Sequence, residues 1–400
     1  MNISLDQIAT LFLAVALLLL GGFIIKRVGL LNKFCIPAPV VGGLLFAILV
    51  LILRQTGAVN LELDTSLQSI FMLTFFTTVG LGASFQLVKL GGKLLVIYWL
   101  ACGALALFQS VIGISLATAL GLEPLLGVMM GAVSMEGGHG AATAFGGTIE
   151  ELGIHSALSV GLAAATFGLI AGGLVGGPTV KYLITKHNLK PKDTNQHDEI
   201  AAAKETDESK SSFQSNNFLT QILIITFCMT AGTFLGSGFS NLTGFVLPSY
   251  VGAMFVAVIV RNILDKVNAN IVDMKAVNFI GDITLGIFLA MALMSIKLWE
   301  VAELALPMLV IVFAQVVFIV LLSIFVLFRL FGKDYDAAVM VGGFTGHGLG
   351  ATPNAMANMS AITAKYGASP KAFLIVPIVG AFLIDVFAMP IIITSINLLK

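Results

Sequence analysis

Long apolar runs recur along this sequence, and they limit its fold more than any other feature. Ten runs are unbroken and come close to or exceed the about 20 residues that a helix needs to cross a bilayer. They are residues 5–25, 36–53, 67–88, 94–120, 157–184, 218–239, 245–260, 277–296, 304–330 and 372–396. With 58% hydrophobic residues among 400, the chain has more apolar surface than a soluble core can bury. The sequence therefore predicts an all-α polytopic membrane protein with ten transmembrane helices.

Two further apolar stretches, about 124–148 and 336–363, are interrupted by glycine and proline. They contain SMEGGHGAATAFGG and GGFTGHGLGATPNAMANM, and each has a histidine within Gly-His-Gly, His139 or His347. Clustered glycines and a proline cannot sustain a continuous helix. Broken segments at corresponding places of two halves are typical of the binding site of a secondary transporter. We therefore expect two re-entrant hairpins that meet near the middle of the membrane.

The positive charges indicate how the chain crosses the membrane. Counting the spans from an outside start places 18 of the 21 Lys and Arg residues on the cytoplasmic side and leaves Arg54, Lys297 and Lys400 outside. This is a strong positive-inside bias, and it weakens if either interrupted stretch crosses completely. Lys26 and Arg27 follow the first apolar run, so this run is predicted to be a span and not a signal peptide. We expect both termini outside, and the zero net charge gives no reason to expect nucleic acid binding.

A polar segment, residues 185–217, divides the chain into two similar parts. It has few large apolar residues and cannot bury enough surface to fold alone, so we expect a cytoplasmic linker. Residues 1–184 and 218–400 each contain five unbroken runs and one interrupted stretch. In each part a glycine, Gly42 or Gly252, comes a few residues after a proline. Five crossings per half invert the second half. The sequence therefore predicts two inverted five-helix repeats, each with a re-entrant hairpin.

The three cysteines, Cys35, Cys102 and Cys228, lack the paired spacing of a zinc site, and their odd number argues against a disulfide framework. We expect them to pack among apolar residues. The spacing of Glu136 and His139 resembles a metal-ligating pair on one helix face, but the intervening glycines break the helix. A membrane metalloenzyme is therefore a remote alternative.

Four long motifs together resemble the bacterial glutamate:sodium symporter family. Two are the interrupted stretches, and the others are FLAMALMSIKLWEVAELALPML at 288–309 and AFLIVPIVGAFLID at 372–385. The resemblance covers nearly the whole chain except the linker. It implies a secondary transporter of the bacterial inner membrane, with no enzymatic activity and no cofactor, that imports L-glutamate with sodium as the coupling ion. It also implies a homodimer in which a hairpin-bearing part moves against a scaffold.

Two residues depart from the pattern of that family. Glu136 takes the place of a small hydroxyl residue, and Asp282 takes the place of an asparagine. Both add negative charge near the expected site. A sodium-coupled carrier of another amino acid, or of a di- or tricarboxylate, is therefore an alternative. A channel is less favoured, because two opposed hairpins occlude a path more naturally than they line an open pore.

Glutamate carries two carboxylates, yet the predicted spans contain no Lys or Arg except Lys181 and Arg329, which lie in the last four residues of their spans. The remaining donors are backbone N–H groups freed where the helices break, at the positive ends of helix dipoles. The candidate substrate-binding residues are Gly137, Gly138, His139, Gly140, Thr143, Gly346, His347, Gly348, Gly350, Thr352 and Asn354. The alternative is that the glycines only permit close helix packing. Either histidine could carry a proton, or brace its turn as a neutral imidazole.

Asp385 lies within the last apolar run, where an unpaired charge costs ~2.5 to 3.5 kcal/mol on insertion scales. Sodium is the natural counter-ion, with hairpin carbonyls completing its shell; a protonated aspartate is the alternative. Glu136, Asp282 and Asn358 are the further candidates for sodium binding. Moving one net negative charge inward against 100 mV costs ~2.3 kcal/mol, so at least two sodium ions per glutamate are needed for the potential to assist import.

Overall fold

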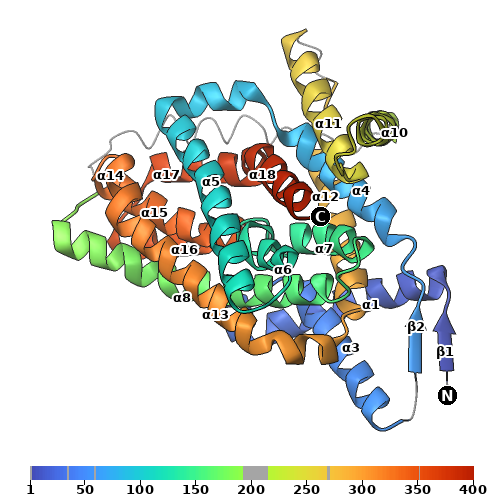
Figure 1. Ribbon diagram of the computed structural model, residues 1–400. Helices are drawn as coiled ribbons and strands as arrows, with labels where there is room; N and C mark the ends of the chain where they lie inside the picture. Colours follow the sequence, from blue (N-terminus) through green and yellow to red (C-terminus); the bar gives the residue numbers. More distant parts are fainter. Residues whose placement is uncertain (1, 34–35, 58–59, 192–214, 268–270, 351) are drawn as a thin grey trace.

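A computed structural model of the chain describes residues 2–33, 36–57, 60–191, 215–267, 271–350 and 352–400, and it is mostly helical (Figure 1). The helices of the first half are α1 (Gln7–Arg27), α2 (Gly29–Lys33), α3 (Ala38–Gln55), α4 (Gln68–Gly82), α5 (Phe85–Ala119), α6 (Pro124–Val128), the π-helical turn η1 (Met129–Val133), α7 (Gly138–Glu151) and α8 (Ala157–His187). Two short strands that the sequence did not predict, β1 (Asn2–Leu5) and β2 (Asn60–Leu63), pair in parallel.

The second half follows the same order of long helices and short interruptions. Its elements are α10 (Ser215–Thr243), α11 (Ser249–Lys266), α12 (Met274–Met294), α13 (Leu298–Leu322), η2 (Ser323–Leu327), α14 (Phe328–Leu330), α15 (Tyr335–His347), α16 (Thr352–Tyr366), α17 (Pro370–Ile378), η3 (Val379–Leu383) and α18 (Ile384–Leu399). The predicted linker falls mostly on residues 192–214, which lie outside the described residues; α8 ends at His187 and α10 begins at Ser215.

Within the described part of the chain, seven helices are long and apolar enough to cross a membrane. They belong to α1, α3, α5, α8, α10, α12 and the continuous stretch from α13 to α14. The other predicted spans correspond to α4, which has only 15 residues, to α11, which carries charges in its last turns, and to the succession of α17, η3 and α18. The protein is a polytopic, mostly helical membrane protein, as the sequence predicted.

One predicted span has a different boundary in the structure. The apolar run 67–88 is not a single helix, because α4 ends at Gly82 and α5 begins at Phe85. Ser84 is the N-cap of α5, and its hydroxyl accepts a hydrogen bond from the N–H of Gln86. Gly92, at φ 60°, then separates the first turns of α5 from the rest of the helix. Hydropathy could not reveal this break, because apolar residues continue on both sides of it.

The helices pack as two groups (Figure 1). Group A consists of α1, α3, α4, α10, α11 and α12, and group B consists of α5 to α8 and α13 to α18. Contacts within each group are extensive, whereas few helices touch across the boundary, among them α12 with α7 and α3 with α13. Cys228 is buried within group A and Cys102 within group B, both as free thiols in apolar clusters, while Cys35 lies outside the described residues.

Similar packing recurs in the two halves. Helix α1 packs on α3 as α10 packs on α11, and α12 packs on α3 as α4 packs on α11. Gly42 lies against the backbone of Leu17 where α3 meets α1, and Gly252 lies against the backbone of Gly232 where α11 meets α10. A Cβ atom at either glycine would overlap the partner backbone, so both permit the same close approach of helices.

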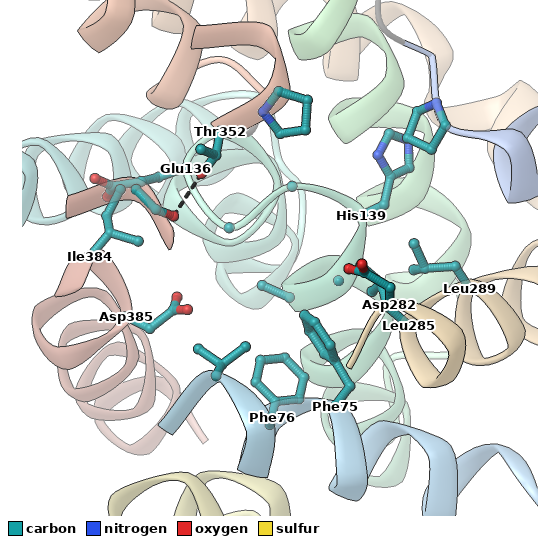
Figure 2. Close-up of a pocket in the computed structure, with 18 of the residues that line it drawn as sticks. Phe75, Phe76, Glu136, His139, Asp282, Leu285, Leu289, Thr352, Ile384 and Asp385 are labelled. Atoms are coloured by element: carbon teal, nitrogen blue, oxygen red, sulfur yellow. Dashed lines mark hydrogen bonds between the residues drawn. The ribbon is translucent and has the colours of Figure 1, made fainter. Parts of the chain in front are cut away.

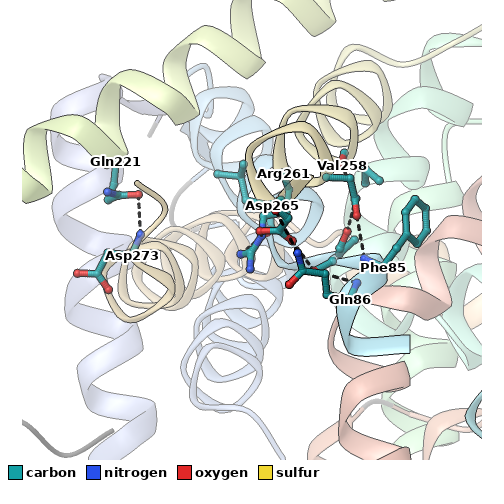
Figure 3. Close-up of polar contacts among 11 residues, drawn as sticks. Phe85, Gln86, Gln221, Val258, Arg261, Asp265 and Asp273 are labelled. Carbon is teal, nitrogen blue, oxygen red and sulfur yellow. Dashed lines mark hydrogen bonds and ion pairs between the residues drawn. The ribbon is translucent and has the colours of Figure 1, made fainter. Parts of the chain in front are cut away.

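The chain passes from group A to group B between α4 and α5, and this connection is fixed to α11 by polar contacts (Figure 3). Ser84 Oγ donates to Asp265 Oδ2 at 2.5 Å, and the N–H of Phe85 donates to Asn262 Oδ1 at 2.8 Å. Arg261 pairs with Asp265 at 2.9 Å and also donates to the carbonyl of Leu81 at 3.2 Å. These bonds satisfy backbone groups that the break between the helices leaves free.

The second passage from group A to group B, between α12 and α13, is also held by an arginine of group A. The guanidinium of Arg54, in the last turn of α3, lies 3.9 Å from the centre of the Trp299 ring at the start of α13. Cation–π contacts of this kind contribute about 0.5 to 1 kcal/mol at exposed sites. Both passages are therefore anchored on group A.

Candidate functional site

A cavity of about 590 Å³ lies between the two groups (Figure 2). Figure 2 shows Glu136, Thr352 and Asp385 of group B facing Phe75, Phe76 and Asp282 of group A. Group A lines it with Leu18, Pro39, Phe75, Phe76, Val79, Asp282, Leu285, Gly286 and Leu289, joined by Pro37 just before α3. Group B lines it with Glu136 to Ala141, Leu169, His347, Thr352, Pro353, Gly380, Ile384, Asp385 and Met389. Both interrupted stretches thus reach one cavity.

The first interruption separates η1 from α7. The N–H groups of Glu136 and Gly137 both bond to the carbonyl of Ala132, at 3.1 and 3.0 Å, which tightens the turn. Gly138 has φ 59°, a left-handed conformation that glycine adopts without steric cost. Helix α7 then begins, and the N–H groups of its first turn have no intrahelical acceptor. The cavity wall therefore includes the start of a helix, where an anion is stabilised.

The second interruption separates α15 from α16, two antiparallel helices. Gly346 lies against Ala355, and Gly343, one turn earlier, lies against Met359. The far ends also meet, because Tyr335 Oη donates to the carbonyl of Gly367 at 2.5 Å. The two helices form a hairpin whose closed end, at His347 and Thr352, contributes to the cavity.

Six of the predicted substrate-binding residues line the cavity, and the other five do not. Those in the wall are Gly137, Gly138, His139, Gly140, His347 and Thr352. Those outside the lining are Thr143, Gly346, Gly348, Gly350 and Asn354. The structure thus brings together the glycines of the first interruption but only side chains from the closed end of the second.

The residues that do not line the cavity have structural partners. Thr143 Oγ1 donates to the carbonyl of His139 at 2.8 Å, within its own helix. Asn354 Nδ2 donates to the carbonyl of Leu169 at 3.1 Å, and the carbonyl of Gly348 accepts from Gln109 at 2.6 Å. A Cβ at Gly346 would overlap the backbone of Ala355. At Gly346 the geometry therefore favours the alternative reading, in which the glycine permits close packing.

Three of the candidate sodium-binding residues share the cavity. Asp385, Glu136 and Asp282 all line it, and none of its described lining residues is Lys or Arg. Glu136 is 5% exposed, and neither of its carboxylate oxygens has a hydrogen-bond partner among the described residues. Asn358 does not line the cavity; its Nδ2 donates to the carbonyls of Gly172 and Gly342, at 3.2 and 3.3 Å. The cavity therefore combines helix starts that suit an anion with carboxyl groups that suit a cation.

Each histidine of the two motifs contacts another helix through one ring nitrogen. His139 Nε2 lies 3.0 Å from Thr166 Oγ1 on α8, and His347 Nδ1 lies 3.0 Å from Tyr98 Oη on α5. Sequence reasoning did not identify Thr166 or Tyr98, since nothing in their local sequence distinguishes them. It also missed Gly380, although this residue lies in one of the four motifs. The carbonyl oxygen of Gly380 accepts a hydrogen bond from the hydroxyl of Thr352 at 2.6 Å.

Aromatic rings separate this cavity from a second one. The second cavity, of about 500 Å³, is lined by Tyr250 and by residues near the start of α4 and the end of α7, including Ser69 and Glu151. The ring centroids of Phe76, in the wall of the first cavity, and Tyr250 are 4.9 Å apart. Phe145 also packs against Tyr250, in a T-shaped contact with ring centroids 5.6 Å apart. These contacts leave two hollows along α4 with a packed layer between them.

Comparison with known proteins identifies the family. A family model described as sodium/glutamate symporter matches residues 3–368. The chain is 43% identical over 383 residues to the sodium/glutamate symporter of Escherichia coli, covering 96% of this chain and 95% of that protein. It is 41% identical over 387 residues to the one of Haemophilus influenzae, covering 96% of each chain. With matches of this extent, the chain belongs to the sodium/glutamate symporter family, and it is a transporter rather than an enzyme.

Proposed function

We propose that this protein imports L-glutamate together with sodium across the bacterial inner membrane, and that both bind in the cavity between groups A and B. The family and the names of its relatives support this substrate and this ion. The observation that carries the proposal is the convergence of two helix interruptions and Asp385 on one cavity whose described lining has no cationic side chain. Such a cavity suits an amino acid, which brings its own positive charge.

The glutamate carboxylates bind at the starts of α7 and α16. The N–H groups of Gly138, His139 and Gly140 occupy the first turn of α7. Thr352 begins α16, and its hydroxyl, which donates to the carbonyl of Gly380 in this structure, serves a carboxylate by exchanging that acceptor. A negative charge at a helix start gains about 0.3 to 1 kcal/mol, and up to ~2 kcal/mol where it is partly buried. Several such contacts together replace an arginine or lysine.

Sodium binds at the carboxyl groups of the cavity, with Asp385 as the principal ligand and Glu136 and Asp282 elsewhere in the cavity wall. Asn358 is proposed to act at a distance, because its amide holds α16 against α8. At least two sodium ions accompany each glutamate, since one would only cancel the net charge of the substrate. Recording transport currents in proteoliposomes tests this number. Electrically silent uptake would contradict it.

We further infer the membrane arrangement of the chain. Residues 1–184 and 218–400 form inverted repeats of five spans, each interrupted stretch re-enters from the side where it began, and both termini lie outside. The support is the recurrence of the same helix pairings in both halves and the distribution of positive charges. The resemblance to the family supports a homodimer. Measuring the molecular mass of the detergent-purified protein tests this oligomeric state.

Transport proceeds by alternating access, in which group B moves against group A and carries the hairpins past the packed rings of Phe76 and Tyr250. The support is the presence of a hollow on each side of these rings. Single cysteines at Leu73, beside the second cavity, and at Leu285, in the first, test this motion. We expect an impermeant maleimide to label them from opposite sides, with reactivities that change when sodium and glutamate are added. Labelling of both from one side under all conditions would contradict it.

Uptake of radiolabelled glutamate into proteoliposomes, driven by an inward sodium gradient, tests the substrate. A potassium gradient of equal size is the control. We expect other amino acids and di- or tricarboxylates, added at tenfold excess, to compete poorly. These competitors are included because Glu136 and Asp282 add negative charge to the cavity. Stronger inhibition by one of them than by unlabelled glutamate would assign the transporter to that substrate.

A further inference from the structure

The ring nitrogens of His347 point to a specific role that rests on the proposed function. His347 is 1% exposed, and its Nε2 has no hydrogen-bond partner among the described residues. This nitrogen lies against Gly380, where a Cβ atom would overlap it, and both residues line the cavity. A buried polar atom without a partner costs about 1 to 3 kcal/mol, so an unpartnered nitrogen on a residue that lines the cavity points to a ligand that reaches it when Gly380, which covers it, shifts.

Tyr98 determines which nitrogen of His347 carries the proton. Its phenol is fully buried, stacks on Phe331 with centroids 5.4 Å apart, and has His347 Nδ1 as its hydrogen-bond partner at 3.0 Å. If Nδ1 carried the proton, the buried phenol hydrogen would lack an acceptor among the described residues. If the phenol donates to Nδ1, only the N–H at Nε2 lacks a partner. The second arrangement leaves fewer groups unsatisfied, so His347 has its proton on Nε2.

His139 has the same motif but a different arrangement. Its Nε2 lies 3.0 Å from Thr166 Oγ1, and that hydroxyl lies 2.9 Å from the carbonyl of Leu162. When Thr166 donates to Leu162, it can accept the N–H of His139 Nε2, and two hydrogen bonds form. When Thr166 instead donates to His139 Nε2, the carbonyl of Leu162 receives no hydrogen from it, and only one hydrogen bond forms. The proton of His139 is therefore directed at Thr166, and only an acceptor nitrogen, Nδ1, is left for the cavity.

We propose that Tyr98 positions His347 so that its Nε2–H donates a hydrogen bond to a carboxylate of the substrate, whereas Thr166 holds His139 in a form that cannot. Gly380 leaves the space that the imidazole edge needs. A carboxylate at this place gains a neutral side-chain donor in addition to the backbone donors of the helix starts. The two Gly-His-Gly motifs are thus alike in sequence and opposite in hydrogen-bonding role.

The variant Tyr98→Phe tests this positioning role by sodium-driven glutamate uptake in proteoliposomes. We expect the KM for glutamate to rise about tenfold or more, since a hydrogen bond to a charged group is lost, while Vmax and the sodium dependence stay near their wild-type values. Tyr335→Phe is the matched control, because Tyr335 is also a buried tyrosine with one hydrogen bond, to the carbonyl of Gly367, but lines neither cavity. In the His347→Phe variant, Tyr98→Phe should add no further rise in KM.

An unchanged KM in a Tyr98→Phe protein that transports, or an equal rise in Tyr335→Phe, would overturn the proposal. Nitrogen NMR of histidine-labelled protein in lipid, with the His347 signals assigned by their loss in His347→Phe, tests the tautomer without transport. Protonated Nε2 supports the proposal and protonated Nδ1 overturns it, even if Tyr98→Phe fails to fold. Wild-type protein without sodium-driven glutamate uptake would refute the proposed function, and the NMR result would still decide the tautomer.

Discussion

The two interruptions share the Gly-His-Gly motif, but the protein uses them differently. The glycines of the first, Gly137, Gly138 and Gly140, lie in the wall of the cavity. In the second, Gly346 packs on Ala355, and Gly348 packs on Ile319 and Leu105. The first therefore presents backbone to the cavity, and the second presents side chains from a tightly packed hairpin. Positions that share a sequence motif need not have equivalent functions.

The first interruption contains an acidic residue, Glu136, and substituting it gives the strongest test of this difference. Glu136, three residues before His139, lines the cavity beside the first turn of α7, whereas the position three residues before His347 is Phe344, which is fully buried and packs on Tyr98 and Phe331. Asp385 of α18 lines the same cavity as both interruptions. The question is whether sodium binding depends on Glu136, which belongs to the first interruption, or on Asp385, which lines the cavity that both interruptions reach.

The largest effect is expected for Asp385→Asn. Removing one partner of a buried ion pair costs about 3 to 5 kcal/mol, so sodium-driven glutamate uptake should fall by a factor of roughly one hundred or more. Glu136→Ser should leave the affinity for glutamate near its original value and weaken the sodium dependence less than Asp385→Asn. Binding and uptake measured over a range of sodium concentrations check both variants. A greater loss in Glu136→Ser would place the principal sodium ligand at the first interruption.

A smaller effect is expected when a methyl group is added to one glycine of each interruption. In Gly346→Ala the new Cβ overlaps the backbone of Ala355, so α15 and α16 must separate, at a cost of typically about 1 to 3 kcal/mol. In Gly140→Ala the nearest atoms are Phe75 Cε1 at 3.6 Å and Leu285 Cδ1 at 3.9 Å, which is ordinary contact. Thermal unfolding of the purified variants should show a lower midpoint for Gly346→Ala only. Equal losses of stability would contradict the difference in packing.

The smallest effect is expected for the hydrogen bonds that attach each interruption to α8. Asn358 donates from α16 to the carbonyl of Gly172, and Ser134 Oγ donates from the first interruption to the carbonyl of Gly161 at 2.8 Å. Removing such a bond costs about 1 kcal/mol, and Asn358 has a second acceptor in Gly342. Asn358→Ala should therefore lower the free energy of unfolding more than Ser134→Ala. The opposite order would mean that α8 holds the first interruption more firmly.

Several features of the fold were predictable because they depend on local sequence. The apolar runs correspond to long helices, and the clustered glycines fall where the helices break, at 134–137 and after His347. Local signals failed where apolar residues continue across a break, as at Ser84 between α4 and α5. They also gave no indication of β1 and β2, which are four residues each and pair only with one another.

The candidate site was predictable only in part, because one residue type can serve two purposes. Gly138 and Gly346 both lie next to a histidine, yet Gly138 has a positive φ at the cavity and Gly346 permits helix packing. The same holds for amides, since Asn354 and Asn358 bond to carbonyls of neighbouring helices. Whether a small or polar residue faces a ligand depends on what packs against it, and this is not a local property.

The sequence by itself determined that the chain is a membrane protein with long apolar helices, two interruptions and no cation near its site, because hydropathy, helix breaking and charge are properties of short segments. Only the tertiary structure decided that the interruptions share one cavity with Asp385, and that His139 contacts Thr166 while His347 contacts Tyr98, a residue 249 positions away. Such contacts follow from how helices of distant sequence pack. Packing depends on the shapes of both surfaces, and no single segment contains that information.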